Sequence, residues 1–503
     1  MRYPWVLAAG IAGSSMILID ATAVNVALPV MQRDLAANAA GLQWVIESYT
    51  LFLAALMLVG GALGDRFGRC LVFSTGIAIF TLASIACALA PALDILIVAR
   101  CVQGIGAALA TPGSLALLTA VYSGAERDRA IGIWSGASAI ATAAAPLLGG
   151  WLTQAFSWRA VFLINVPLGI VVVAVAFTNV PESRDQKMGA LDGLGSALVT
   201  AGLAALVYGL IRLQTAGVDS FAASAVAFGI ALLATFAAYE RFGAREPMMR
   251  PALFASRTFT GANLYTFFLY AALSGALYFV PFDLINVHGY SPLAAGAALL
   301  PFVLVLGFGS GWAGGLVARR GRRLPLAAGA ILAAAGFAAF ALPGTGGSYW
   351  TTFFPASLLL GAGGALFVAP LTATVMDAAP SDEAGIASGI NNAVARTGGL
   401  LAIAVLGLIL AWAFNASLDR TIARGGLSPA AAAAIASQRG NVLSGSGVEL
   451  PLPRDVRAGA TLAVHRSYVA GFRAVMLVAT ALALCSAGLA ATWERRKPAA
   501  ARS

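Results

Sequence analysis

The stretch "GGALGDRFGR", Gly60 to Arg69, places three charges and four glycines between two apolar runs, each long enough to cross a membrane. Glycines permit a tight turn and a close approach of two helices, and arginines hold such a turn on one side of the bilayer. The arginines alone would satisfy this topology. The carboxylate of Asp65 therefore has a different purpose, and it makes the loop a candidate functional element.

The rest of the chain has the composition of a membrane protein. Of its 503 residues, 60% are hydrophobic and only 10% are charged, and the mean hydropathy is +0.86. This leaves too little polar surface to cover a soluble globule. A helix needs about 20 apolar residues to cross a hydrocarbon core of about 30 Å. Fourteen such spans are predicted, near residues 5–29, 44–63, 71–90, 94–121, 131–155, 160–179, 193–212, 221–240, 259–285, 293–317, 325–342, 349–375, 385–414 and 471–493.

Lysine and arginine are distributed unevenly between the two sides of these spans. With the N-terminus inside, 19 of the 31 basic residues fall on inner segments and four on short outer segments. Six more lie in one long outer loop, to which the positive-inside rule applies only weakly. The bias predicts that both termini are cytoplasmic and that "GGALGDRFGR" faces the cytoplasm.

An internal repeat divides the chain into two halves. "GALGDRFGR", which begins at Gly61, aligns with "GGLVARRGR", which begins at Gly314, and five residues are identical. Each copy follows the second span of its half. Transporter folds are commonly built from such repeats, with the substrate path along their interface.

The repeat predicts an all-α membrane fold of two six-helix halves around a central cavity. The first half comprises residues 1–180 and the second residues 258–503. A linker, 181–257, carries two inserted transmembrane helices, and Asp192 stands where the cap of the first belongs. The second half contains a long outer loop, 415–470, in which a short helix is predicted between Ser428 and Gly440.

Seven stretches follow one another in order along the chain. They are "LIDATAVNVALP" (18–29), "GALGDRFGR" (61–69), "RCVQGIGAAL" (100–109), "APLLGGWL" (145–152), "SWRAVFLINVPLG" (157–169), "GYSPLAAGAALLP" (289–301) and "GIASGINNAVARTGG" (385–399). Together they resemble the major facilitator superfamily, specifically its fourteen-span drug:proton antiporter branch. The resemblance covers almost the whole chain and implies a proton-driven transporter in the cell membrane, the inner membrane of a bacterium.

The first loop resembles the family's signature between spans 2 and 3, and we interpret it as a gate. Its members are Gly61, Gly64, Asp65, Arg66, Gly68 and Arg69. A carboxylate at Asp65 can pair with the arginines or cap an opposing helix end, and it can be released when the halves rock. A static salt bridge is the alternative interpretation.

Three charged residues within predicted spans are candidates for proton coupling. Asp20 lies fifteen residues beyond Trp5, or about 22 Å along a helix, so it needs a partner or a proton. Glu47 begins span 2, where it is either buried or at the outer interface. Arg100 shares a helix face with Gln103, which predicts that it faces a cavity or a carboxylate. Snorkelling of the arginine to the interface is the alternative.

Two further spans carry unusual residues. In span 5, which resembles the end of the family's antiporter motif, Pro146 bends the helix, and Gly149 and Gly150 provide a small face for close packing. Ala145 stands where the family commonly has glycine.

In span 13, Asn391, Asn392 and Arg396 form a polar cluster in an apolar helix. Hydrogen bonds between helices explain the asparagines. For Arg396 two interpretations stay open, a water-filled cavity or a contact with substrate.

The sequence gives no support for catalysis or metal binding. "GSGWAG", which begins at Gly309, fits the GxGxxG pattern, but it lies inside an apolar span with no soluble strand before it. HExxH and GxxxxGK[ST] patterns are absent from the sequence. His288 and His465 are far apart in sequence and are expected to be outer-loop residues rather than ligands. We therefore expect no enzyme, no metal and no cofactor, with a proton gradient as the driving force.

The sequence thus predicts proton-coupled export of small amphipathic, cationic organic compounds, that is, multidrug efflux by alternating access. A dedicated exporter of one metabolite or self-made antibiotic is the alternative. A channel or membrane sensor, from another class, is disfavoured by the repeated halves and their paired inner loops. The expected partners are the substrate, protons and the lipid bilayer, without nucleic acid, and we expect the protein to function as a monomer.

Overall fold

The chain is helical throughout most of the part that the computed structural model describes. That part comprises residues 4–122, 124–183, 192–216, 219–244, 247, 251–309, 321–379, 384–424, 427–437 and 453–493. It contains no strand, and thirteen of its helical segments are long and apolar enough to cross a membrane. A further helix of 32 residues occupies the place predicted for the fifth span. The all-α prediction is confirmed.

The first half contains six spans. Its helices are α1 (Pro4–Asp34), α2 (Ala39–Phe67), α3 (Arg69–Leu89), α4 (Leu93–Val121), α5 (Gly124–Ala155), α6 (Ala160–Leu163) and α7 (Asn165–Asn179). The short α6 and α7 together form the sixth span. They are separated just before Pro167, whose missing N–H removes one bond of the helical ladder.

The inserted helices and the second half follow. Their elements are α8 (Gly193–Ala216), α9 (Ser220–Phe242), η1 (Pro251–Ala255), α10 (Arg257–Phe282), η2 (Asp283–Val287), α11 (Pro292–Ala298), α13 (Arg323–Phe340), α14 (Phe353–Asp377), α15 (Ala384–Ala423), α16 (Pro429–Ser437) and α18 (Arg454–Trp493). The helical segment that starts with α11 reaches Gly309 after a turn at Leu299.

Glycines bring three helices of the first half into backbone contact. A Cβ at Gly106 of α4 would lie 2.5 Å from the backbone nitrogen of Phe80 in α3, and one at Gly60 of α2 would overlap the carbonyl of Ala108 in α4. Small residues permit this approach between membrane helices. As a result α4 is held tightly between α2 and α3.

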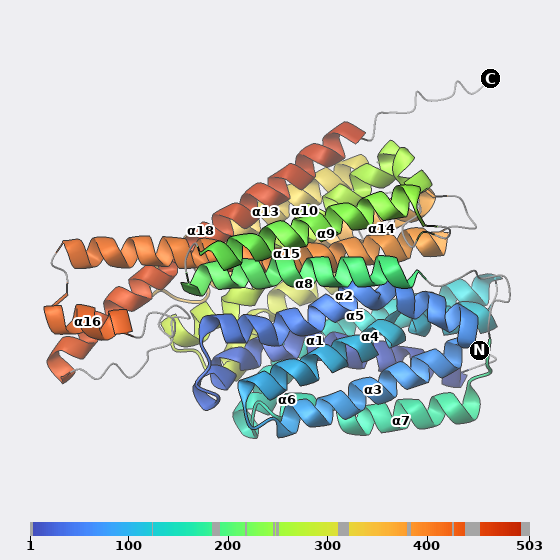
Figure 1. Cartoon of the computed structure of the whole chain (residues 1–503), viewed down its shortest axis with the longest axis horizontal. Helices are drawn as coiled ribbons and strands as arrows, with labels where there is room; N and C mark the ends of the chain where they lie inside the picture. Colours follow the sequence, from blue (N-terminus) through green and yellow to red (C-terminus); the bar gives the residue numbers. More distant parts are fainter. Residues whose placement is uncertain are drawn as a thin grey trace.

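The inserted α8 lies over the seam at which α2 of the first half faces α15 of the second (Figure 1). Leu51 of α2, Val207 of α8 and Leu400 of α15 belong to one buried hydrophobic cluster. Gln43 of α2 also donates a hydrogen bond to the carbonyl of Ile403 in α15 at 3.2 Å. The inserted pair therefore covers a lateral joint between the halves.

Side-chain caps fix the hairpin of α8 and α9. Asp192 accepts a hydrogen bond from the N–H of Gly195 at 2.8 Å, which confirms it as the predicted cap of α8. Asp219 caps α9 and pairs with Arg212 at 2.9 Å. The cap and the arginine lower the pKa of the Asp219 carboxyl.

The two ends of the helix bundle differ. The start of α1 and the end of α18 lie at the same end, and α16 lies at the opposite one, which we call the distal end (Figure 1). The helices α15 and α18 each have 40 residues. Such helices are about 60 Å long, twice the thickness of the hydrocarbon core, so both project beyond the bundle.

Much of the segment 415–470, expected as a loop, is helical because α15 and α18 continue into it. The extensions are rich in alanine and arginine, which favour helix without an apolar face. The predicted short helix is α16, and Ser428 caps it by accepting from the N–H of Ala431 at 3.2 Å. Its predicted end at Gly440 lies outside the described residues.

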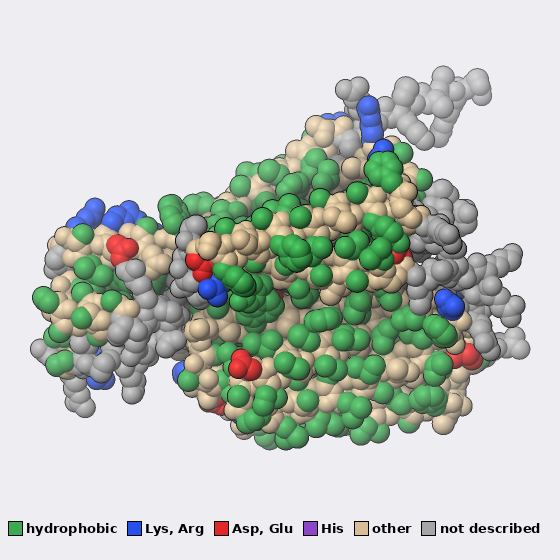
Figure 2. All heavy atoms as spheres, viewed as in Figure 1, with side chains coloured by type: hydrophobic (Ala, Val, Ile, Leu, Met, Phe, Trp, Pro, Cys, Tyr) green, Lys and Arg blue, Asp and Glu red, His purple; other side chains and the backbone are tan. Residues whose placement is uncertain are grey.

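The surface agrees with a membrane setting. Hydrophobic side chains dominate the face seen in Figure 2, and its few charged side chains lie near the ends of the helices. Large apolar residues such as Leu82, Ile140 and Phe308 are at least two-thirds exposed. Such exposure is favourable against lipid and not against water.

Candidate functional site

A buried ion pair lies inside the first half. Arg100 of α4 donates from Nη1 to Oδ2 of Asp20 in α1 at 2.5 Å, and neither side chain is exposed. The Nε of Arg100 donates to the carbonyl of Val45 in α2 at 3.0 Å. Because a buried charge is stable only when it is paired and hydrogen-bonded, each charge depends on the other.

Three neutral side chains surround the pair. Gln103 of α4 and Asn165 of α7 each donate to Oδ1 of Asp20 at 3.0 Å. Ser84 of α3 accepts from Gln103 at 2.8 Å, and Arg100 donates to Oε1 of Gln103 at 2.6 Å. We call these five side chains the charged network. It joins α1, α3, α4 and α7.

Aromatic rings complete the surroundings of the guanidinium. The ring of Tyr49 lies 4.2 Å from Cζ of Arg100, and the ring of Phe162 lies 5.7 Å away. Gly104 makes the first contact possible, since a Cβ there would lie 2.5 Å from the carbonyl oxygen of Tyr49. Cation–π attraction thus adds to the ion pair. Full burial of Arg100 does not fit the snorkelling interpretation.

Glu47 of α2 differs from Asp20. It is fully buried, so it does not lie at the outer interface. Within the described structure neither of its carboxylate oxygens makes a hydrogen bond. It interacts electrostatically with Tyr278 of α10, across the boundary between the halves. A lone carboxylate in such a setting is costly unless it carries a proton.

The asparagines predicted on α15 face different surroundings. Asn391 donates to Oδ1 of Asn263 at 3.1 Å and to Oγ1 of Thr266 at 2.7 Å, both on α10. We call these three side chains the neutral network. The adjacent Asn392 is exposed. Asn391 therefore matches the predicted hydrogen bonding between helices.

Arg396 of α15 lies at the boundary between the halves. It is partly buried, and it interacts electrostatically with Tyr49 of α2 and with Tyr270 of α10. Tyr49 also covers the guanidinium of Arg100. One tyrosine thus connects an arginine of the second half to the charged network of the first.

Hydrogen bonds hold the gate loop in place at one end of the first half. Gly68 has φ of +124°, a conformation that favours glycine, and its N–H donates to the carbonyl of Gly64 at 3.0 Å. Glu182, which follows α7, accepts from the N–H groups of Cys70 and Leu71 at 3.0 Å each. This carboxylate satisfies free N–H groups at the start of α3 and is favoured by the helix dipole.

The remaining members of the gate loop are less constrained. Gly61 leaves room for Pro112 of α4, which would contact a Cβ at 3.6 Å. Arg66 is exposed, and the backbone N–H of Arg69 donates to the carbonyl of Ser183 at 2.9 Å. The side chain of Asp65 lies outside the described residues.

Residues 310–320, which include most of the second copy of the loop, also lie outside the described part of the chain. Its last arginine, Arg322, forms a salt bridge with Asp377 at the end of α14. The exposed side chain of Asp377 limits the strength of this pair.

The glycines of the antiporter motif bring the two halves together. A Cβ at Gly149 would lie 2.6 Å from a carbonyl of α1, and one at Gly150 would overlap the carbonyl of Pro292 in α11. In the reverse direction, a Cβ at Gly296 of α11 would overlap the carbonyl of Pro146. The first half and the second half are therefore in backbone contact through α5 and α11.

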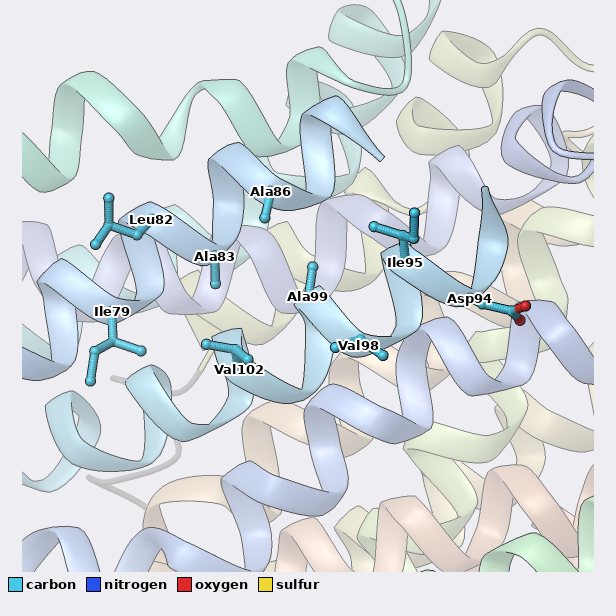
Figure 3. Close-up of a pocket in the computed structure, with 9 residues that line it drawn as sticks. All are labelled: Ile79, Leu82, Ala83, Ala86, Asp94, Ile95, Val98, Ala99 and Val102. Carbon is cyan, nitrogen blue, oxygen red and sulfur yellow. The ribbon is translucent and has the colours of Figure 1, made fainter. Parts of the chain in front are cut away.

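A groove between α3 and α4 lies apart from these residues (Figure 3). Apart from Asp94, its lining is apolar: Ile79, Leu82, Ala83, Ala86, Ile95, Val98, Ala99 and Val102. Leu82 and Val98 are more than half exposed. Because the groove opens on the apolar outer surface, it is not part of the charged network.

The sequence analysis did not identify several residues of the site. Ser84, Asn165 and Tyr49 are ordinary in membrane helices, and only the fold brings them to Arg100. Glu182 could have been identified from the sequence, because it is a carboxylate directly after span 6, on the same side of the membrane as the gate loop.

The prediction that both histidines are loop residues is confirmed for His288, which lies in the bend after η2, and is wrong for His465. His465 lies within α18 and not in a loop, and it is close enough to His288 for an electrostatic interaction. Among the described residues, no group of three His, Cys, Asp or Glu side chains is arranged to hold a metal ion.

Two membrane-spanning halves with a buried charged network between four helices define a multi-pass membrane transporter. The family model of the Major Facilitator Superfamily matches residues 10–403. The chain belongs to this superfamily, and it is a transporter and not an enzyme.

Two relatives illustrate the resemblance. The multidrug resistance protein Stp of Mycobacterium tuberculosis (strain CDC 1551 / Oshkosh) is 34% identical over 93% of this chain and 88% of its own. The tetracenomycin C resistance and export protein of Streptomyces glaucescens is 33% identical over 98% of this chain and 92% of its own.

Solved structures share the fold. A bacterial homologue of the human lysosomal transporter Spinster, in an inward-facing and unoccupied conformation, matches with a TM-score of 0.64 and 21% identity over 98% of both chains. An auto-inhibited peptide transporter of the POT family matches with a TM-score of 0.64 and 15% identity, over 98% of this chain and 97% of its own.

Proposed function

We propose that this transporter exports small amphipathic organic compounds, cations among them, in exchange for protons. Its halves alternate between opening to the cytoplasm and opening to the outside. The named relatives, one of multidrug resistance and one of antibiotic export, support this direction. In this proposal the protein lies in the inner membrane of a bacterium, the termini are cytoplasmic, and the distal end faces outward.

The observation that carries the proposal is the buried pair of Asp20 and Arg100. A proton on Asp20 would remove the negative charge and leave Arg100 as a lone buried cation. Leaving one charge of a buried pair uncompensated costs about 3–5 kcal/mol. Protonation therefore favours a different arrangement of the helices, which is the linkage that an antiporter requires.

Glu47 supplies a second carboxyl group, whose surroundings favour the opposite protonation state. In the present arrangement Asp20 has a cation and hydrogen bonds, whereas Glu47 has neither. The arrangement therefore favours an ionised Asp20 and a protonated Glu47. A change of conformation that exposes Glu47 or buries Asp20 without its arginine would move the proton.

The contact between α5 and α11 supports a gate at the distal end. A hydrophobic cluster continues there from Leu28 of α1 and Leu42 of α2 in the first half to Ile285 of η2 in the second. Opening this end requires separation of the backbone contact at Gly150. At the other end, the gate loop held by Glu182 moves with α3 as one unit.

The proton gradient provides enough energy for useful export. One proton that moves inward down a membrane potential of 100 mV releases about 2.3 kcal/mol. At one proton per molecule this sustains roughly a fifty-fold gradient of substrate. Tyr49, Tyr270 and Arg396 at the boundary between the halves provide aromatic and polar contacts for an amphipathic compound.

Export of a single metabolite or antibiotic is the second candidate function. It is favoured by the relative that is named for tetracenomycin C, which matches almost the whole chain. A panel of dyes and drugs of varied shape distinguishes the two candidates. Transport of several unrelated compounds supports multidrug efflux, and transport of one supports the dedicated exporter.

The proposal is tested in inverted membrane vesicles with an imposed pH gradient and the cationic dye ethidium. The wild-type protein should accumulate ethidium inside the vesicles and release protons from them. Asp20→Asn cannot exchange a proton at this position. It should keep ethidium exchange without a gradient and lose gradient-driven accumulation.

Asp34→Asn is the matched control, because Asp34 ends the same helix and its side chain is half exposed. This variant should transport as the wild type does. Undiminished accumulation and proton release in Asp20→Asn, at wild-type abundance, would show that Asp20 does not carry the coupling.

A further inference from the structure

A further buried carboxylate, in addition to Asp20 and Glu47, lies in the second half, away from the charged network. Asp283 begins η2, and its Oδ2 lies 3.3 Å from Nδ1 of His288. The side chains are only 2% and 5% exposed. The ring of His288 packs edge-to-face on Phe353 of α14 with centroids 5.0 Å apart. The segment between the two residues is a π-helix, a feature that occurs frequently at functional sites.

His465 of α18 completes this cluster. It interacts electrostatically with His288, and these two are the only histidines in the chain. Within the described structure, Oδ1 of Asp283 and Nε2 of His465 are buried without a hydrogen bond. Buried polar atoms without a hydrogen bond are rare, and these two belong to side chains that can gain or lose a proton.

Titratable or charged groups lie near the pair on α18, on α10 and in the turn before α11, whereas α14 contributes the apolar ring of Phe353. They are His465, Tyr468 and Arg473 of α18, Tyr278 of α10, and Tyr290 of the turn before α11. Tyr468 donates to the carbonyl of Phe279 at 3.5 Å, and Arg473 donates to the carbonyls of Leu342 and Pro343, so both are engaged with the backbone. No other cation among the described residues forms a salt bridge with Asp283.

Burial favours the protonation state in which the pair of Asp283 and His288 has no net charge. With one proton, an Asp283 carboxylate and a His288 imidazolium have no net charge; without it, the carboxylate is a lone buried anion. Burial lowers the pKa of His288, but its contacts with Asp283 and with the carbonyl of Gly344 outweigh this, so that the pKa lies above its ordinary value. The stabilisation is present at low pH and is lost as pH rises through this raised pKa.

The pair is connected directly to the contact between the halves. The N–H of Tyr290 donates to the carbonyl of Leu284 at 2.9 Å and ties the turn after His288 to η2. Two residues after Tyr290, the carbonyl of Pro292 lies against Gly150 of the first half. Separation of α11 from α5 therefore pulls on the turn that covers the pair.

We propose that Asp283 and His288, with His465 beside them, form a second proton-binding site, at which a proton from outside the cell favours closure of the distal end. This inference rests on the proposed proton-coupled export. After substrate release, the open distal end admits a proton to His288. Closure then buries a neutral pair, whereas closure without the proton would bury an uncompensated carboxylate.

Two histidines in the whole chain allow a direct test of proton binding. Protein labelled with ¹³C-histidine, freed of any affinity tag and placed in lipid nanodiscs, should show two histidine signals, and His465→Gln assigns them. We expect His288 to titrate above about pH 6.5. Asp283→Asn should lower its midpoint by about one pH unit, a tenfold change in proton affinity. A midpoint at or below 6.5, or one that Asp283→Asn leaves unchanged, would overturn the proposal.

Transport separates this proposal from proton-coupled export itself. Ethidium accumulation by inverted vesicles is measured against the pH of their interior, which the distal end faces. Asp283→Asn and His288→Gln should flatten this pH dependence while ethidium exchange without a gradient persists. Tyr290→Phe, which keeps the ring beside His288 and lacks the hydroxyl, is the matched control and should behave as the wild type does.

The outcomes are distinct. If the wild type shows no proton-driven accumulation, the proposed function fails and the second site fails with it. If the wild type is coupled and both variants retain its pH profile, only the second site is overturned.

Discussion

The charged network of the first half and the neutral network of the second differ in the effect of removing one side chain. Removal from the first leaves a buried charge without a partner, whereas removal from the second leaves only neutral groups. In the first, Asp20 and Arg100 form a salt bridge that is fully buried among three neutral side chains. In the second, Asn391 bonds to Asn263 and Thr266, and none of these carries a charge. The two networks therefore differ in charge. A change of protonation can act in the first network and has no group to act on in the second.

This difference has an energetic scale. Breaking a buried ion pair by removal of one partner costs about 3–5 kcal/mol, because the other charge remains without compensation. A hydrogen bond between neutral side chains in a membrane contributes about 0.6 kcal/mol on average. Substitutions in the charged network should therefore have the larger effects. Measurements of transport and stability in variants of both networks test this contrast.

Arg100→Ala should have the largest effect. It leaves Asp20 buried without its cation, so we expect gradient-driven accumulation of ethidium to be lost and the midpoint of thermal unfolding to fall strongly. Arg100→Lys keeps the charge but lacks the planar donor fork, so it should recover only part of the function. The measurements are vesicle accumulation and thermal unfolding in detergent.

A double variant separates coupling from folding in this experiment. Combining Arg100→Ala with Asp20→Asn removes both charges, and it should be more stable than Arg100→Ala alone while it remains uncoupled. Normal uphill export by Arg100→Ala would show that the arginine is a structural anchor only.

The sequence alone predicted the charged residues of this network and Gln103, but not its other neutral members. A charge in an apolar span is conspicuous because it needs a partner, so Asp20 and Arg100 were identifiable. Ser84 and Asn165 were not, since a single small polar residue is unremarkable in a membrane helix. Their positions, 84 and 165, approach residue 20 only through the packing of four helices.

The fold was predictable to a greater extent than the site. Apolar length and the distribution of arginine predict spans directly, and Asp192 and Ser428 were identified as caps from local pattern. The helical extensions of α15 and α18 were missed, because beyond the membrane no apolar run marks a helix. The approach of His465 to His288 was missed because it depends on how α18 packs against η2.

Glu47→Gln should have an intermediate effect. Glutamine is neutral, as a protonated Glu47 is, and of similar size, so the protein should remain about as stable as the wild type. Proton-driven accumulation should fall for cationic ethidium and much less for an uncharged substrate. The measurement is the ratio of the two accumulation levels in wild type and variant.

Glu126→Gln, at the exposed start of α5, is a matched control for the removal of a carboxylate. It should leave that ratio unchanged. Equal losses for charged and uncharged substrates in Glu47→Gln would assign Glu47 to the proton alone and not to recognition of cations.

Asn391→Ala should have the smallest effect of the three. It removes two neutral hydrogen bonds to α10, which at about 0.6 kcal/mol each amount to less than a tenfold change in any equilibrium that they bias. Uphill export should therefore persist at a reduced rate, with a small drop in the midpoint of thermal unfolding. Asn392→Ala, at the exposed neighbouring position, is the matched control and should transport at the wild-type rate. A loss in Asn391→Ala as deep as that in Arg100→Ala would mean that coupling depends on the neutral network as much as on the charged network, and the contrast between the networks would be wrong.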